Sequence, residues 1–233
     1  MEPFETVEYR GYTIELHRDE NPWNPREEQD NLGTMVYGGH RYVLGDVQFG
    51  KGLDRYPWTT PSPDTHTAGE WEDWAESMGL IYLRTYAYIH GTVVMDTRGF
   101  HGRLPQGHAE FDSGHAGWIF VSREKIREWR GWKRITEKRR EQIEKSLAAE
   151  VQEYSDYCQG NVCGYIIKGP DGEDSGEIDS SCWGFFGDDG QKYALEEAQA
   201  TIDFWIRAEE ERIAGIFQGA ANMREQIISQ AYA

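Results

Sequence analysis

The chain has 233 residues, of which 38% are hydrophobic, 13% aromatic and 28% charged, so it holds enough apolar material for a core and its composition excludes a disordered chain. Its 24 basic and 41 acidic residues give a formal net charge of −17, which argues against direct binding of duplex DNA, because the field around the protein repels polyanions. The charge is uneven: residues 117–149 carry +5, whereas residues 1–75 carry −9 and residues 150–233 carry −12.

The cysteine content and the first residues indicate the compartment. Three cysteines, Cys158, Cys163 and Cys182, are too few for a disulfide framework. The N-terminus shows neither the basic nor the apolar region of a signal peptide, and no apolar run reaches the length of a membrane span. We therefore expect a cytoplasmic protein without a membrane partner.

Strands are predicted mainly in pairs, because β-branched and aromatic residues gather in short segments that turn residues separate. The predicted hairpins are 4–9 with 12–17 around Arg10-Gly11, 34–37 with 40–44 around Gly38-Gly39, 80–90 with 92–96 around Gly91, and 162–168 with 176–186 around Pro170-Asp171-Gly172. One further strand is predicted at 117–121. Residues 18–33 and 46–69 are expected to be loops, because prolines, glycines and charges interrupt them.

Helices are predicted where apolar residues recur every three or four positions. They cover residues 70–79, 123–129, 136–157 and 191 onward. Ser122 is placed to cap the second of these helices, and Gly160 is placed to end the third.

Because the predicted strands come first along the chain and the helices later, we expect an α+β fold. It has a mostly antiparallel sheet built from hairpins, and its helices are concentrated in the C-terminal half. We expect a single α+β domain over residues 1–213, followed by a C-terminal helical extension over residues 214–233. A break in the last helix is expected near Gly215 or Gly219. Residues 220–233 can fold back, mediate self-association into a homo-oligomer, or fray, and the sequence leaves these alternatives open.

The most chemically suggestive stretch is the glycine-rich segment 101–115. It holds His101, His108 and His115 at spacings of seven, with Glu110 and Asp112 between them, and histidine with carboxylate is a ligand set that zinc accepts. A spacing of seven in a loop fixes no coordination geometry, and the tight metal-binding motifs are missing from the sequence. We therefore expect neither a metal site nor a cofactor, and ordinary solvated loop residues are the simplest interpretation.

A pocket remains an alternative for this segment. His108, Asp112 and His115 would form it together with Asp179 and Trp183 from the segment 179–190, whose aromatic residues are otherwise typical of a core. A cysteine nucleophile is not expected there, because Asp179 lies close to Cys182 in sequence and an acidic neighbour raises a thiol pKa.

The positive segment of the chain admits two interpretations. Acidic residues fall three or four positions from basic ones, as in Glu137 with Arg140 and Glu141 with Lys145, which is typical of a solvated helix face. If the segment instead binds an anion, a nucleotide or one edge of an RNA fits better than duplex DNA. The basic residues are Arg123, Lys125, Arg127, Arg130, Lys133, Arg134, Lys138, Arg139, Arg140 and Lys145.

Three stretches, GYTIELHRDENPWNPREEQDNLGTMV, DSGHAGWIFVSREKI and SSCWGFFGDD, resemble a group of acidic proteins encoded by bacteriophages and mobile elements. The resemblance extends over residues 12–195. It implies an accessory protein that counters host defences, and it supplies no catalytic residues.

Two functional hypotheses follow. The first is an interaction protein, not an enzyme, that inhibits a host nuclease or defence complex in the host cytoplasm, with an acidic surface that occupies a basic nucleic-acid-binding groove. The second is a small-nucleotide-binding protein or hydrolase that uses the histidine-rich segment 101–115. The acids expected to form the surface of the first hypothesis are Asp188, Asp189, Glu196, Glu197, Asp203, Glu209 and Glu210.

Overall fold

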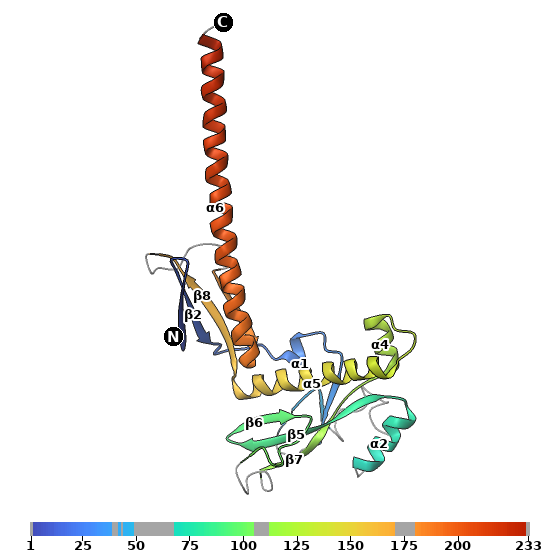
Figure 1. Cartoon of the computed structure of the whole chain (residues 1–233). Helices are drawn as coiled ribbons and strands as arrows, with labels where there is room; N and C mark the ends of the chain where they lie inside the picture. The colour runs from blue at the N-terminus through green and yellow to red at the C-terminus, as the bar shows by residue number, and fades with distance from the viewer. Residues whose placement is uncertain are drawn as a thin grey trace. The chain divides into compact units, whose positions relative to one another are not determined.

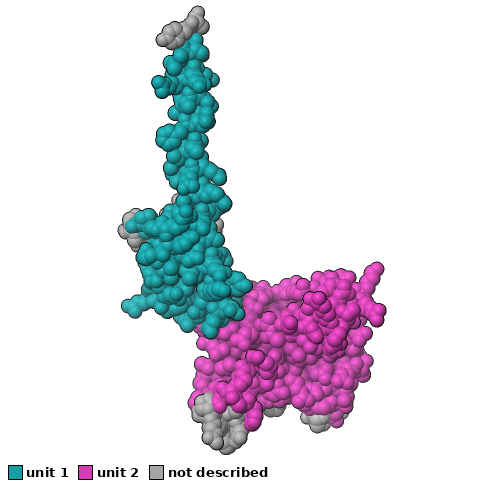
Figure 2. All heavy atoms as spheres, in the orientation of Figure 1, with its two compact units in different colours: residues 1–20, 162–233 teal, residues 21–161 magenta. Residues whose placement is uncertain are grey.

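The computed structural model describes residues 2–38, 42, 44–48, 68–104, 112–170 and 180–231, and it has the predicted α+β fold (Figure 1). The chain divides into two compact units, residues 1–20 with 162–233 (unit 1) and residues 21–161 (unit 2), which Figure 2 colours separately. The single domain over residues 1–213 stays a prediction, because two compact units can unfold together or independently.

Unit 1 contains a four-stranded antiparallel sheet in the order β1-β2-β8-β9. Its strands are β1 (Glu5–Tyr9), β2 (Tyr12–Arg18), β8 (Val162–Lys168) and β9 (Ser181–Phe186). The predicted pairing of the first two strands is confirmed, and so is that of the last two. The first turn places Arg10 and Gly11 at positive φ angles of 51° and 86°. Most of the second turn, residues 171–179, lies outside the described residues.

A 45-residue helix, α6 (Gly187–Ala231), completes unit 1. Ala194, Ala198 and Ile202 are fully buried and pack against the apolar face of the sheet, which includes Ile14 and Tyr165. The helix is continuous through Gly215 and Gly219, so the break predicted there is wrong. From residue 207 to residue 230 every residue is exposed.

Unit 2 contains a five-stranded sheet in the order β4-β3-β7-β5-β6, in which only the short β3–β4 pair is parallel. Its strands are β3 (Thr34–Tyr37), β4 (Val47–Gln48), β5 (Ile81–His90), β6 (Thr92–Asp96) and β7 (Ser113–Val121). The predicted β5–β6 hairpin is confirmed. The second strand of the predicted hairpin around Gly38-Gly39 lies largely outside the described residues. β7 begins four residues earlier than predicted, so the end of the histidine-rich segment is a strand.

Helices cover both faces of this sheet. They are α1 (Pro25–Glu28), α2 (Ala68–Ser77), α4 (Arg123–Arg130) and α5 (Glu137–Gln159). Buried residues of α5, including Leu147, pack on the face that presents Ile119, whereas Trp71 of α2 stacks on Trp118 at 4.4 Å on the other face. The predicted caps are confirmed: the Ser122 hydroxyl accepts a hydrogen bond from the Lys125 amide, and α5 ends at a left-handed Gly160.

Candidate functional site

The residues of the predicted histidine pocket have separate partners where the structure describes them. The Asp112 carboxylate lies 3.2 Å from Nδ1 of His90, whereas the His115 ring contacts the ring of Trp118 at a centroid distance of 4.7 Å. Trp183 belongs to unit 1, and His108 and Asp179 lie outside the described residues. The alternative pocket therefore stays a prediction.

His115 is held in its neutral form at pH 7. Its packing against the rings of Trp118 and Tyr86 lowers the pKa of the imidazole, and the positive charge of Arg84 lowers it further. The side chain nevertheless remains exposed at the surface of the sheet, and its ring is hydrogen-bonded to the backbone of Gly117.

Trp183 is a partly exposed side chain rather than a core residue. It lies on β9 with 39% of its surface exposed, and its ring is 6.3 Å from the ring of His17. A side chain on the opposite residue Gly164 would collide with it, because a Cβ there would lie 2.5 Å from the indole ring. The indole thus covers the β8 backbone and leaves one part of its surface free for contacts.

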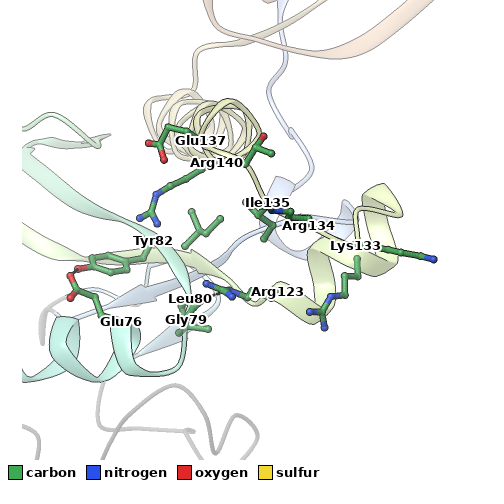
Figure 3. Close-up of a pocket in the computed structure, with 13 residues that line it drawn as sticks. Glu76, Gly79, Leu80, Tyr82, Arg123, Lys133, Arg134, Ile135, Glu137 and Arg140 are labelled. Carbon is green, nitrogen blue, oxygen red and sulfur yellow. Dashed lines mark hydrogen bonds between the residues drawn. The ribbon is translucent and has the colours of Figure 1, made fainter.

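Unit 2 contains a cleft of about 630 Å³, which we call the basic cleft. Its walls come from the end of α2, the start of β5, the first turns of α4 and the residues that lead into α5 (Figure 3). The lining residues are Glu76, Gly79, Leu80, Ile81, Tyr82, Arg123, Arg127, Lys133, Arg134, Ile135, Thr136, Glu137 and Arg140.

Positive charge dominates the basic cleft, with five basic side chains against the two acids Glu76 and Glu137. Arg123 donates a hydrogen bond to the carbonyl of Gly79 at 3.2 Å, and Figure 3 shows it and Arg140 reaching in from different helices. Within the described part of the chain, the side chains of Lys133 and Arg134 have no ion-pair partner. The N-terminal end of α5 adds the positive end of a helix dipole.

The basic cleft changes the interpretation of the positive segment as a uniformly solvated helix face. Arg140 pairs with Glu144 at 2.8 Å rather than with the predicted partner Glu137. Five of the ten basic residues line one concave surface, although they lie on α4, on α5 and on the segment between these helices. The sequence showed that basic residues are concentrated in this segment. It did not show that α2 and β5, which lie earlier in the chain, form the opposite wall of the cleft.

The predicted acidic residues of α6 fall into two groups. Three have basic neighbours: Asp203 pairs with Arg10 at 2.6 Å and accepts hydrogen bonds from Tyr9, Glu209 pairs with Arg212 at 2.6 Å, and Glu196 lies 3.8 Å from Lys192. The other group consists of the exposed acids Asp188, Asp189, Glu197 and Glu210, none of which forms an ion pair with the residues that the structure describes.

The two units differ in charge. Unit 1 has 7 basic and 20 acidic residues, a formal charge of −13, whereas unit 2 has 17 basic and 21 acidic residues, a formal charge of −4. The negative charge of the protein therefore resides mainly in the unit that contains α6, and the basic cleft lies in the unit that is closer to neutral.

Neither the buried thiol of Cys163 nor the partly buried thiol of Cys158 provides a nucleophile in the described core. Burial raises the pKa of Cys158 to about 11 and that of Cys163 to about 11. Both are protonated near neutral pH, and the thiolate is the reactive form.

Comparisons of the chain with protein-family models, with curated proteins and with solved structures found no match. Among the helices that the structure describes, none combines the length and the apolar character needed to cross a bilayer.

Proposed function

We propose that the protein is an interaction protein whose acidic unit 1 binds a basic, nucleic-acid-binding groove on another protein. The observation that carries this proposal is the concentration of charge: unit 1 holds −13 of the net −17. The resemblance to acidic phage proteins supports a host nuclease or defence complex as the target. Binding blocks the groove against nucleic acid, and it needs no catalytic residue in this chain.

The spacing of the acids along α6 indicates how such binding works. From Asp188 to Glu210 the helix rises about 33 Å, at about 1.5 Å per residue. The seven predicted acids are spread over this length, whereas duplex DNA carries one charge per roughly 1.7 Å. The helix therefore attracts a basic groove through its overall field and does not reproduce the phosphates one by one.

The test compares two sets of charge reversals. The first set, Glu196→Lys, Glu197→Lys and Glu210→Lys, removes negative charge from α6 and leaves the structural pair of Asp203 with Arg10 intact. The control set, Asp73→Lys, Glu128→Lys and Glu141→Lys, reverses three exposed acids of unit 2. Both sets raise the net charge equally, so a difference in binding between them shows that the position of the acidic residues matters, and not only their number.

The readout is capture of proteins from a bacterial lysate at low and high salt, with duplex DNA as the competitor. We expect the wild type and the control set to retain nucleic-acid-binding proteins that DNA or high salt releases, and the α6 set to lose them. Captured proteins that DNA does not displace, or equal losses in both sets, contradict the proposal. High salt weakens such contacts because charges more than about 8 to 10 Å apart are screened near physiological ionic strength.

The basic cleft favours a second candidate function, binding of a small phosphate-bearing ligand by unit 2. Its volume of about 630 Å³ lies within the range of roughly 300 to 1,000 Å³ that is typical of small-molecule sites. Arg134 and Arg140 can bind phosphate oxygens, and Leu80, Tyr82 and Ile135 provide less polar surface for a base. This candidate function places small-nucleotide binding in the basic cleft instead of the histidine-rich segment 101–115.

Calorimetric titration with adenosine diphosphate and with inorganic phosphate tests the second candidate. Arg134→Glu and Arg140→Glu are expected to lower the affinity at least about tenfold, because each reverses a charge inside the cleft. Arg130→Glu and Lys138→Glu are matched controls on α4 and α5 that do not line the cleft. Equal weakening by the controls indicates attraction to the whole basic segment and rejects the cleft as a site.

A further inference from the structure

The second half of α6 exposes a regular apolar stripe. Its side chains recur at alternating spacings of three and four, which is the heptad pattern of a coiled coil. Phe217 lies beside the stripe with 72% of its surface exposed, and Met223 and Ile227 are exposed to 64% and 62%. The stripe consists of Ile213, Ile216, Ala220, Met223 and Ile227.

Within the described residues, no part of the chain covers this half of the helix. The helix continues past the sheet of unit 1 (Figure 1), and residues 207–230 are all exposed. Gly215 and Gly219 each cost about 1 kcal/mol relative to alanine in a helix interior. Because helices in water gain most of their stability from packing of an apolar face, the stripe predicts a partner surface.

We propose that this partner is a second copy of the same helix, which packs antiparallel to the first across the stripe. In the antiparallel register, Ile213 packs against Met223 of the second copy, and Ile216 packs against Ala220 of the second copy. The two-fold symmetry repeats each contact, so Ile213, Ile216, Ala220 and Met223 supply both sides of the central layers, whereas Ile227 lies opposite Glu209 of the second copy. This inference does not depend on either function proposed above.

Charge complementarity selects the antiparallel orientation. In this register Glu210 lies beside Arg224 of the second copy at a position that flanks the apolar stripe, and symmetry forms the pair twice. In a parallel pair, Glu209 instead lies against Glu209 of the second copy, and Arg224 lies beside Gly219. Neither Glu209 nor Arg224 then has a partner of opposite charge. Like charges at such positions disfavour the parallel pair.

The small residues near the centre of the stripe fit the same arrangement. The axis of the antiparallel pair passes close to Gln218, so Gly219 lies next to Gly219 of the second copy. Apart from its chain neighbours and the backbone of the same helix, no described atom lies within 4 Å of a Cβ built at this glycine, which leaves space for a neighbouring helix. Ala220 in the adjacent layer also permits a close approach of the two backbones.

Sedimentation equilibrium of the full chain over a wide range of protein concentration tests the proposal. We expect a concentration-dependent dimer. Met223→Glu places a charge in the stripe and is expected to weaken the dimer at least tenfold. Asn222→Glu, which adds the same charge on the outward face, is the matched control and leaves the dimer within about twofold.

A charge exchange tests the orientation. Glu210→Arg alone and Arg224→Glu alone are each expected to weaken the dimer several-fold, and the two together to restore it, because the pair is re-formed with the charges exchanged. A chain that is monomeric at every concentration overturns the proposal, as does a dimer that Met223→Glu leaves intact. A dimer that the double variant fails to restore contradicts the antiparallel orientation.

Discussion

The guanidinium of Arg26 donates two hydrogen bonds to the carboxylate of Asp46, from Nε to Oδ1 at 2.8 Å and from Nη2 to Oδ2 at 2.5 Å. Its Nη1 donates to Glu150 on α5 at 2.8 Å and to Asn31 at 2.9 Å, and the arginine side chain is only 2% exposed. The two carboxylates also accept backbone hydrogen bonds, Asp46 from Met35 and Glu150 from the amide of residue 32. One buried cation thus connects three segments of unit 2.

Arg26→Met is expected to lower the free energy of unfolding by about 3 to 5 kcal/mol, because it leaves two carboxylates partly buried without their cation. Arg26→Lys is expected to restore only part of this loss, since an ammonium group lacks the two-pronged geometry of guanidinium. Urea denaturation measures both variants. Arg130→Met, at an exposed position of α4, is the control and is expected to change stability by less than about 0.5 kcal/mol.

Gly117 is expected to tolerate no side chain. It lies in β7 with φ of +152°, and a Cβ there would be 1.9 Å from the carbonyl oxygen of Val36 on the neighbouring strand. Gly117→Ala must therefore separate β3 from β7, and we expect a loss of about 3 kcal/mol or more. Gly114→Ala in the same strand meets no atom within 4 Å and serves as the control. Equal stability of the two variants in thermal or urea unfolding would contradict the tight strand contact.

The sequence predicted the elements whose signals are local and missed those whose partners are distant. The hairpin at Arg10-Gly11 and the cap at Ser122 depend on neighbouring residues, and both are confirmed. Arg26 lies in a segment rich in prolines and charges, which indicated an exposed loop. Asn24 before Pro25 was a usable signal for the short helix α1, since asparagine caps helices and proline suits their first position.

The same distinction applies to the candidate sites. The acids of α6 were visible as charges, but the pairing of Asp203 with Arg10 joins residues 193 positions apart, and nothing in the local pattern indicated it. The basic cleft likewise needs Glu76 and Tyr82 from the α2–β5 region beside residues of α4 and α5. Sequence periodicity reports which face of an element is apolar, and it does not report which elements face one another.

Glu72 is expected to make stability depend on pH in the acid range. Two hydrogen bonds of 2.6 Å from Arg84 lower the pKa of Glu72 below its ordinary value of 4.5, although partial burial opposes them. Its folded pKa lies below its unfolded pKa, so its contribution is complete above pH 4.5 and is lost as the pH falls through the folded pKa. Because Arg84 is half exposed, we expect at most about 1 kcal/mol.

The comparison of Glu72→Gln with the wild type isolates this contribution. The variant is expected to be less stable than the wild type at pH 7, and the difference is expected to be smaller at pH 3, because the wild type loses this contribution as the pH falls through the folded pKa of Glu72. Asp73→Asn on the exposed side of α2 is expected to match the wild type at both pH values. A constant difference between Glu72→Gln and the wild type at all pH values would show that the ion pair contributes nothing.

The buried thiol of Cys163 and the partly buried thiol of Cys158 are expected to react only when the protein unfolds. With the pKa of Cys158 and of Cys163 raised to about 11, roughly one thiol in a thousand is ionised at pH 8. In urea the ordinary thiol pKa returns, and we expect alkylation by iodoacetamide at pH 8 to become at least about a hundredfold faster. Mass spectrometry of the labelled peptides measures the two sites separately. Rapid labelling of Cys158 or Cys163 in the native protein would mean that the site opens to solvent, or that its thiolate is stabilised, and either result would make that cysteine a candidate nucleophile.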